Sequence, residues 1–162
     1  MYRPFPLVLW YATFLILAAA TGTRAQVDPQ ALRQQQFDTM ARGDVAGALA
    51  LYTDDAVLDG IGLCAAAPCV GKNALQKELE NQIAHKVHAT ALNSYVFGPV
   101  VTTRYAVHSD ATQQAGVDRI IGWDIVEMKQ GKMATVRGPL WERTDAQTAQ
   151  YLEWQRTQKA TR

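Results

Sequence analysis

The chain has few of the residues on which common catalytic and cofactor sites depend. Its only serines are Ser94 and Ser109, and neither lies in a nucleophile-elbow sequence. There is no glycine-rich phosphate loop. The three histidines, His85, His88 and His108, show no ligand spacing with the two cysteines. We therefore expect no serine nucleophile, no nucleotide or other organic cofactor, and no metal.

Charge of one sign is also missing. The formal net charge is +1, and no run of basic or acidic residues stands out. Proteins that bind nucleic acid neutralise phosphates with a clustered basic face. Nucleic acid is therefore not an expected partner.

Long apolar runs are absent after the first 25 residues, but these residues form a pattern of their own. Arg3 precedes the apolar run Leu7–Ala20, and the small residues Thr23 and Ala25 follow it. This is the layout of a secretory signal. A retained membrane anchor is the alternative, although a spanning helix needs roughly 20 apolar residues and this run is shorter.

We therefore predict a signal peptide over residues 1–25 and a mature start near Gln26. The remainder, 26–162, has a length that suits a single domain. The predicted location is periplasmic or secreted, with no stable membrane anchor once the signal is removed.

The two cysteines, Cys64 and Cys69, are close together in the sequence CAAAPC. In an exported protein such a pair can form a disulfide. Redox-active pairs more often have two intervening residues, so we favour a structural disulfide that closes a short loop over free or reactive thiols.

The first half of the predicted domain reads as helices around one strand. Asp28-Pro29 favours a helix start, and this helix is expected to end near Gly43. Asp44 caps a second short helix that runs to Tyr52, and 53–55 is predicted as a polar turn. The expected strand covers 56–63, and a third helix covers 71–86.

The second half is rich in Val, Ile, Thr, Tyr and Trp, with turn signals between the runs. It predicts a loop over 110–116, a final helix from Asp145 and a frayed tail from Gln155. The four predicted antiparallel strands are 88–97, 100–108, 117–128 and 133–141. Helices followed by hairpin-linked strands indicate an α+β fold, with about three N-terminal helices packed on a curved antiparallel sheet around a pocket.

Asp59 and Asp124 are the candidate acid–base residues. Asp59 shares a strand face with Val57 and Ile61, where apolar neighbours would raise its pKa. A solvated aspartate at a strand end is the alternative reading. Asp124 stands in the middle of an apolar strand, which is costly unless the acid is paired.

A structural ion pair is the alternative role for Asp124. Its candidate partners are Arg104, Arg119 and Arg137, which lie on neighbouring predicted strands. Arg104 is also a candidate electrostatic partner in catalysis.

Histidines and aromatic residues complete the candidate site. His108 and His88 lie on strands and could titrate near neutral pH, although most such histidines are surface groups. Trp123, Tyr105 and Trp141 could line a pocket for a flat apolar ligand. Core packing or a dimer face is the more common environment of aromatic residues on strands.

The segments GDVAGALALYTDDAVLDGIG, GKNALQKELENQI and GWDIVEMKQGKMATVRG resemble the SnoaL-like and ketosteroid-isomerase-like branch of the nuclear transport factor 2 superfamily. The resemblance spans about 29–143. It implies a cone-shaped fold with a deep pocket, and a homodimer through the outer face of the sheet. Members include isomerases, polyketide cyclases, dehydratases, epoxide hydrolases and non-catalytic binding modules, so the fold alone does not fix the function.

The isomerase residues carry over incompletely. The base aspartate of that branch falls one residue after Asp59, on Gly60, and the second acid falls on Asp124 if the hairpin is one residue shorter. The expected tyrosine of the first helix falls near Gln36, which lacks that hydroxyl. This pattern argues against steroid isomerisation. The cyclases of the family pair an aspartate with a histidine, a role that His88 or His108 could take.

The resulting prediction is an exported protein that binds a small apolar ligand. As an enzyme it would be a cofactor-independent isomerase, cyclase or dehydratase that transfers protons. The alternative is a non-catalytic ligand-binding or assembly module of the same fold.

Overall fold

The computed structural model describes residues 28–160. The predicted signal peptide and the predicted start near Gln26 lie outside these residues. The elements, in chain order, are α1 (Pro29–Ala41), α2 (Val45–Ala50), β1 (Tyr52–Asp59), η1 (Gly62–Cys64), β2 (Cys69–Val70), α3 (Lys72–Ala84), β3 (His88–Phe97), β4 (Val100–His108), α4 (Asp110–Gln114), β5 (Ile120–Lys129), β6 (Lys132–Trp141) and α5 (Ala146–Ala160).

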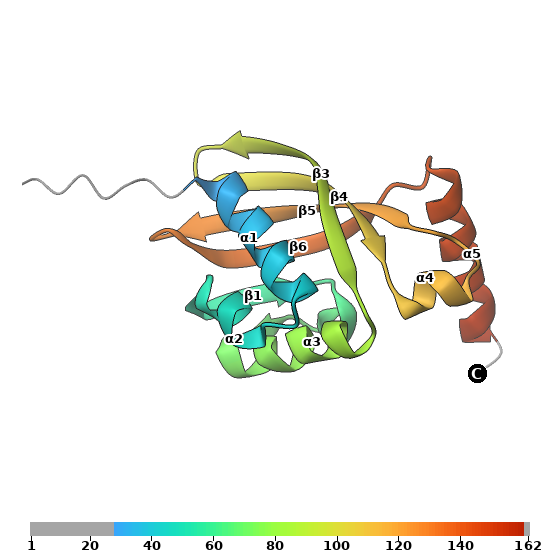
Figure 1. The fold of residues 1–162 in the computed structure, drawn as a ribbon, viewed down its shortest axis with the longest axis horizontal. Helices are drawn as coiled ribbons and strands as arrows, with labels where there is room; N and C mark the ends of the chain where they lie inside the picture. Colours follow the sequence, from blue (N-terminus) through green and yellow to red (C-terminus); the bar gives the residue numbers. More distant parts are fainter. Residues whose placement is uncertain (1–27, 161–162) are drawn as a thin grey trace, which may run out of the picture.

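One six-stranded sheet organises the fold, in the order β2-β1-β6-β5-β4-β3. Strands β3 to β6 pair antiparallel, as the hairpin pattern predicts, whereas β1 pairs parallel with β6. Figure 1 shows α1 crossing one face of the sheet, α2 and α3 near its β1 side, and α4 and α5 together at one end. The predicted α+β class, with helices packed on a mainly antiparallel sheet, is confirmed.

Local sequence explains where the helices begin. The Asp28 side chain accepts a hydrogen bond from the backbone N–H of Gln30, and the Asp44 side chain accepts one from Gly47. Both satisfy donors that a first helical turn leaves unpaired. The prediction of these two helices and of α3 is confirmed to within a few residues.

Three local predictions differ from the structure. The strand expected from Ala56 begins at Tyr52, so the predicted polar turn is part of the strand. Its exposed residues 54 and 55 stay extended because the pairing with β6 shifts register between Tyr52 and Val57. The loop expected over 110–116 contains α4, which starts with a reciprocal capping box between Ser109 and Thr112. The helix α5 continues through Gln155 to Ala160 instead of fraying.

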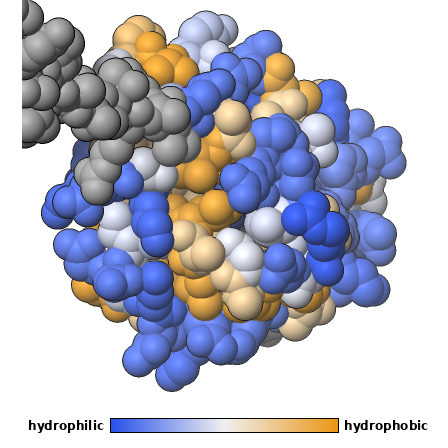
Figure 2. Space-filling view, turned by 60° about the vertical axis from the view of Figure 1, so that its left-hand side comes forward, coloured by the Kyte–Doolittle hydropathy of each residue, from blue (hydrophilic) through white to orange (hydrophobic). Residues whose placement is uncertain are grey.

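The core lies between the helices and the inner face of the sheet. One buried group packs α3 against β1 and β6 through Leu75, Leu58 and Val136. A second joins Phe37 of α1 and Tyr105 of β4 to the far end of the sheet. The surface is mixed: on the face in Figure 2 a band of apolar residues runs between hydrophilic margins. None of the described helices has the length and apolar character that a membrane span requires.

Candidate functional site

A cavity of about 470 Å³ lies inside the cone, between α1, α3, α5 and the inner face of the sheet. Its buried end is formed by α1, β1 and β4, which contribute Arg33, Phe37, Tyr52 and Tyr105. The exposed lining residues are Gly60, Gly62, Ala65, His85 and Lys159, so the cavity opens between the η1 loop and the C-terminal ends of α3 and α5. Most of the remaining wall is apolar.

A buried ion pair stands at the inner end of this cavity. The Arg33 guanidinium donates through Nη2 to Asp124 and through Nη1 to the side-chain oxygen of Gln36. Its Cζ lies 4.1 Å from the ring centroid of Phe37 and 6.0 Å from that of Tyr105. Asp124 has no exposed surface and Arg33 is 5 % exposed. The aromatic rings and the carboxylate together hold the guanidinium in one position.

This inner end keeps some of its hydrogen-bonding capacity unused. Within residues 28–160, Arg33 Nε and Asp124 Oδ1 are buried without a hydrogen-bond partner. Buried polar groups normally have partners, and a group left without one costs free energy. Arg33 lines the cavity, so its free Nε donor is a place where a ligand can add the missing partner, whereas Asp124 lies behind Arg33 and is not among the lining residues.

Burial sets the protonation of the groups around this pair. Burial raises the pKa of Asp124, and the nearby Arg33 charge opposes that shift. Burial raises the pKa of Tyr52 to about 12 and also raises that of Tyr105. Both tyrosines therefore keep their hydroxyl protons at neutral pH and can donate to a bound molecule.

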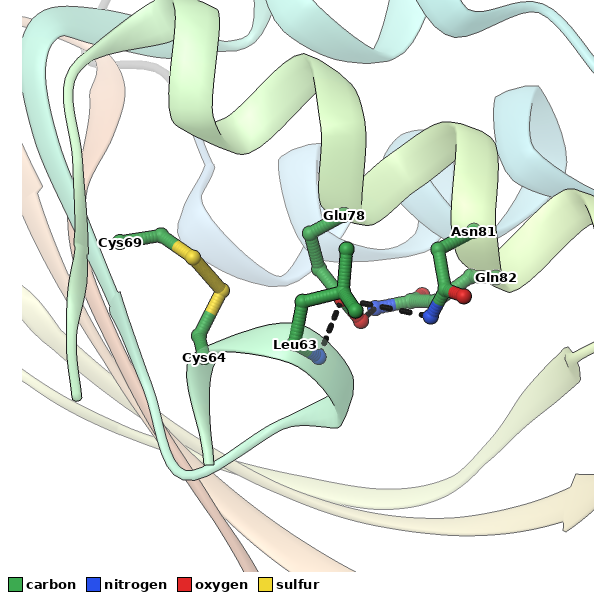
Figure 3. Close-up of a disulfide and its surroundings, with 6 residues drawn as sticks. All are labelled: Leu63, Cys64, Cys69, Glu78, Asn81 and Gln82. Carbon is green, nitrogen blue, oxygen red and sulfur yellow. Dashed lines mark hydrogen bonds between the residues drawn. A yellow bond between two sulfur atoms is a disulfide. The ribbon is translucent and has the colours of Figure 1, made fainter. Parts of the chain in front are cut away.

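A short loop, closed by a disulfide, forms part of the cavity opening. Cys64 and Cys69 are joined, which confirms the predicted pairing. The Glu78 carboxylate of α3 accepts a hydrogen bond from the backbone N–H of Leu63 at 2.8 Å and from Gln82 at 2.7 Å (Figure 3). Residue 62 has a positive φ, and a Cβ there would meet a Glu78 carboxylate oxygen at 2.2 Å, so glycine is required at this contact.

The structure places the two predicted acids differently. Asp124 faces the helix-covered side of the sheet, where it pairs with the lining residue Arg33, but it is not itself among the lining residues. Its partner, however, is Arg33 of α1, and the prediction of a partner on a neighbouring strand is wrong. Those arginines pair elsewhere: Arg104 with Glu142, Arg119 with Asp145, and Arg137 with Glu127. Asp59 ends β1, half-buried and opposite Arg137 in the register, and is not among the lining residues.

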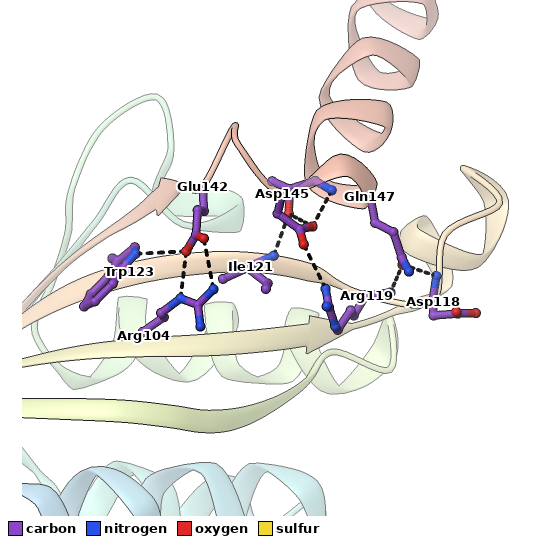
Figure 4. A network of polar contacts seen from close by, with 9 residues as sticks. Arg104, Asp118, Arg119, Ile121, Trp123, Glu142, Asp145 and Gln147 are labelled. Carbon is purple, nitrogen blue, oxygen red and sulfur yellow. Dashed lines mark hydrogen bonds and ion pairs between the residues drawn. The ribbon is translucent and has the colours of Figure 1, made fainter.

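Arg104 and Trp123 lie on the other side of the sheet. Arg104 holds Glu142 through two hydrogen bonds, of 2.7 and 2.9 Å, and Trp123 Nε1 donates to the same carboxylate at 3.3 Å (Figure 4). Trp123 also stacks on Tyr95, with ring centroids 6.1 Å apart. The structure therefore assigns Arg104 and Trp123 to an outer-face network and leaves them outside the cavity wall.

The two strand histidines are exposed and also lie outside the cavity wall. His88 and His108 are opposite one another where β3 and β4 pair. His108 Nδ1 lies 2.6 Å from the backbone oxygen of Asp118. Tyr105 and Trp141, in contrast, line the cavity, the first at its inner end.

Several lining residues were missed by the sequence analysis. Arg33, Gln36 and Phe37 lie on one face of α1 together with Met40. Their spacing is that of one helix face, but two of them are polar, so the face does not read as an apolar stripe in the sequence. Glu78 is three residues after Leu75 and next to Leu79, so it lies on the buried side of α3. Within the described residues, no group of three or more His, Cys, Asp or Glu side chains could hold a metal ion.

A comparison with protein-family models matches a SnoaL-like domain over residues 34–136. The chain belongs to the SnoaL-like domain family. This family lies within the NTF2-like superfamily, so the predicted resemblance is confirmed. A comparison with curated proteins finds no match.

Solved structures share the fold of this SnoaL-like chain at low sequence identity. An NTF2-like protein from Cytophaga hutchinsonii is 10 % identical, with 75 % of this chain and 96 % of that chain covered and a TM-score of 0.58. The epoxide hydrolase/cyclase-like enzyme SalBIII of salinomycin pyran ring formation is 17 % identical, with 72 % and 92 % covered and a TM-score of 0.59.

A third solved structure carries a ligand. A Mycobacterium tuberculosis protein in complex with estradiol-17beta-hemisuccinate is 19 % identical, with 70 % and 92 % covered and a TM-score of 0.57. At these identities the three matches establish the fold of this chain and leave its activity open.

Proposed function

We propose that this SnoaL-like domain binds a small, largely apolar molecule in the cavity of the cone. The observation that carries the proposal is a cavity of about 470 Å³ with a mainly apolar wall and an ion pair at its inner end. This combination of an apolar wall with a few fixed polar groups is typical of ligand sites. The steroid derivative bound by the M. tuberculosis protein supports the same class of ligand.

A fluorescent apolar probe tests this proposal. N-phenyl-1-naphthylamine is neutral and becomes fluorescent when it leaves water. The Ala89→Trp variant would fill the cavity from β3 and abolish the fluorescence increase, since Ala89 lines the wall. Thr90→Trp is the matched control, because Thr90 is exposed and side chains alternate along a strand. Equal probe binding by both variants would refute the proposal.

A second candidate function is proton transfer by Asp124. Its Oδ1 is buried and unpartnered next to the lining residue Arg33, and burial raises the pKa of Asp124, which makes the carboxylate a stronger base. A substrate with an acidic C–H next to a carbonyl would give a proton to Asp124, while Arg33 Nε–H or a tyrosine hydroxyl would donate a hydrogen bond to the carbonyl oxygen. The alternative remains a module that binds without catalysis.

Hydrogen–deuterium exchange separates these two functions. The neutral ketone 2-tetralone exchanges its acidic C–H protons in D₂O, and a base in the cavity would accelerate that exchange. Asp124→Asn should remove the acceleration while the apolar probe still binds. Asp59→Asn is the matched control, because Asp59 was the other predicted base. Acceleration that survives in Asp124→Asn but not in Asp59→Asn would transfer the role to Asp59, and no acceleration at all would favour the binding module.

We also propose that the chain is exported with residues 1–25 removed. The apolar run after Arg3 and the disulfide between Cys64 and Cys69 support this. Mass spectrometry of the protein recovered outside the cytoplasm should give a chain that starts near Gln26 and is lighter than its reduced form by two hydrogens. An intact N-terminus would contradict the proposal.

A homodimer through the outer face of the sheet is a further proposal. Tyr95, Phe97 and Leu140 are large apolar residues that are at least half exposed, next to the half-buried Trp123. Contiguous apolar surface of this kind is typical of an interface. Sedimentation should show a dimer that Phe97→Asp dissociates, and a monomeric wild type would contradict the proposal.

A further inference from the structure

The C-terminal helix α5 supplies part of the cavity wall from outside the matched family region. Tyr151, Gln155 and Lys159 follow at intervals of four, which places them on one side of a helix, and all three line the cavity. The SnoaL-like match ends at residue 136, before α5 begins. The wall that α5 adds is therefore a feature that the family match does not describe.

The N-terminal half of α5 is fixed to the sheet, so its lining side chains have defined positions. Asp145 accepts a hydrogen bond from the backbone N–H of Thr148, and the Thr148 hydroxyl accepts one from the backbone N–H of Ile121 (Figure 4). The Gln147 side chain accepts from the backbone N–H groups of 118 and 119. Further along the helix, Gln155 Nε2 donates to the Tyr151 hydroxyl at 2.9 Å inside the cavity.

Charge is distributed unevenly along the cavity. At the inner end the Arg33 cation is neutralised by Asp124. Near the opening the Glu78 carboxylate is fully buried in the wall, and its hydrogen-bond donors, the Leu63 N–H and the Gln82 amide, are neutral. Lys159 has no acidic partner among residues 28–160, so one uncompensated cation stands at the mouth.

Apart from the buried Glu78, the acidic side chains near the rim in residues 28–160 form ion pairs with other cations. The acid nearest in sequence on the same helix, Glu153, pairs with Arg156. Asp110, which precedes the lining residue Ala111, pairs with Lys86. The exposed imidazole of His85 contributes a further potential donor to the same opening. An exposed cation at the rim of a cavity attracts a ligand group of the opposite sign.

We infer that the ligand is an elongated amphipathic molecule with an anionic group, such as a carboxylate, at the end that faces the opening. This inference rests on the proposed binding function and adds polarity and direction to it. The neutral or weakly polar end would lie at the Arg33–Asp124 pair, the apolar body would lie against Phe37 and Tyr151, and the anionic end would meet Lys159.

A pair of matched competitors tests this inference. Dodecanoate and dodecan-1-ol have the same apolar chain and differ in charge, and each would displace N-phenyl-1-naphthylamine from the full domain. The wild type should prefer dodecanoate, and Lys159→Gln should weaken dodecanoate about threefold to fivefold, the effect expected of one exposed charge, while leaving the alcohol unchanged. Lys159→Arg should keep the preference. Added salt should reduce it, because it screens exposed charges.

Lys77→Gln is the matched control, because Lys77 is an exposed lysine of α3 that does not line the cavity. If the wild type binds both competitors equally and Lys159→Gln changes neither, the inference fails while the proposed function stands. If neither competitor nor the probe binds, the proposed function itself fails.

Discussion

Two arginine–carboxylate pairs lie on opposite faces of the sheet, and their surroundings make them chemically different. Asp124 on the inner face pairs with Arg33 and has no exposed surface. On the outer face Arg104 pairs with Glu142, and about a quarter of each side chain is exposed. Trp123, which touches the outer pair, is the residue directly before Asp124.

Burial decides what each pair does to its carboxyl group. At Asp124 the loss of hydration outweighs the attraction of Arg33, and the pKa is raised. At Glu142 the hydrogen bonds from Arg104 outweigh burial, and the pKa is lowered. The comparison shows that similar salt bridges can shift the pKa of their carboxyl groups in opposite directions, so a salt bridge by itself does not identify a functional acid.

The largest expected effect comes from breaking the inner pair. Asp124→Ala leaves the Arg33 cation buried without its carboxylate, and removal of one partner of a buried pair typically costs about 3–5 kcal/mol. Urea unfolding followed by circular dichroism should show this loss. Asp118→Ala, at an exposed position six residues earlier, is the control and should change stability little. A loss for Asp124→Ala no larger than that of the control would show that the inner pair is not desolvated.

Replacement of both inner partners should cost less than replacement of one. In Arg33→Met with Asp124→Leu no buried charge is left unpaired, and apolar replacements of buried pairs are often neutral or stabilising. We expect the double variant to recover at least half of the stability that Asp124→Ala loses. A double-mutant cycle on the urea midpoints measures the coupling. If the loss in the double variant equals the sum of the losses in Arg33→Met and Asp124→Leu, the two side chains are not energetically coupled.

The outer pair should respond less. Glu142→Gln removes one charge from a partly hydrated pair, so its unfolding midpoint should fall by much less than that of Asp124→Ala. The loss should shrink further in high salt, which screens exposed charges but has little effect on buried ones. A loss independent of salt would indicate that the outer face is covered in solution, as the proposed dimer requires.

The pH dependence of the two carboxyls should have opposite signs. The folded pKa of Asp124 is raised, so its stability contribution is complete below the unfolded value of about 3.9 and is lost as pH rises through the folded pKa. The folded pKa of Glu142 is lowered, so its contribution is present above about 4.3 and is lost as pH falls through the folded pKa.

Subtraction of the stability curves of Asp124→Asn and Glu142→Gln from that of the wild type isolates the two contributions. The expected result is one difference that falls with rising pH and one that rises. If both stability differences change with pH in the same direction, the two carboxyl groups have similar solvation, and the contrast between the inner and outer faces is not supported.

The sequence predicts most of the fold because its signals are local. Capping residues such as Asp28 and Asp44, together with alternation in the strands, place the main helices and four of the six strands near their observed bounds. The short β2 and the helix α4 escape prediction. The first is only two residues long, and the second has threonine in place of Glu or Gln at the third position of its capping box.

The site is less predictable because it depends on contacts between distant elements. The alternation of β5 leaves the direction of Asp124 open because both faces of the strand are largely apolar, and its partner on α1 is 91 residues away and follows from how the helix packs. Trp123 and Arg104 are residue types that often line pockets. Because neighbouring side chains on a strand point to opposite faces, both lie on the outer face of the sheet, away from the cavity. Lys159 lies on a helix whose extent the sequence analysis underestimates.

The parallel pairing of β1 with β6 has a consequence for the order in which the chain can assemble. Val57 pairs with Val70 of β2 on one side, but its neighbour on the other side is Thr135, late in the chain. During synthesis the β6 side of β1 therefore stays unpaired until most of the chain has been made. Folding of such a topology is expected to be slow, since the β1–β6 contact joins strands that are far apart in the sequence.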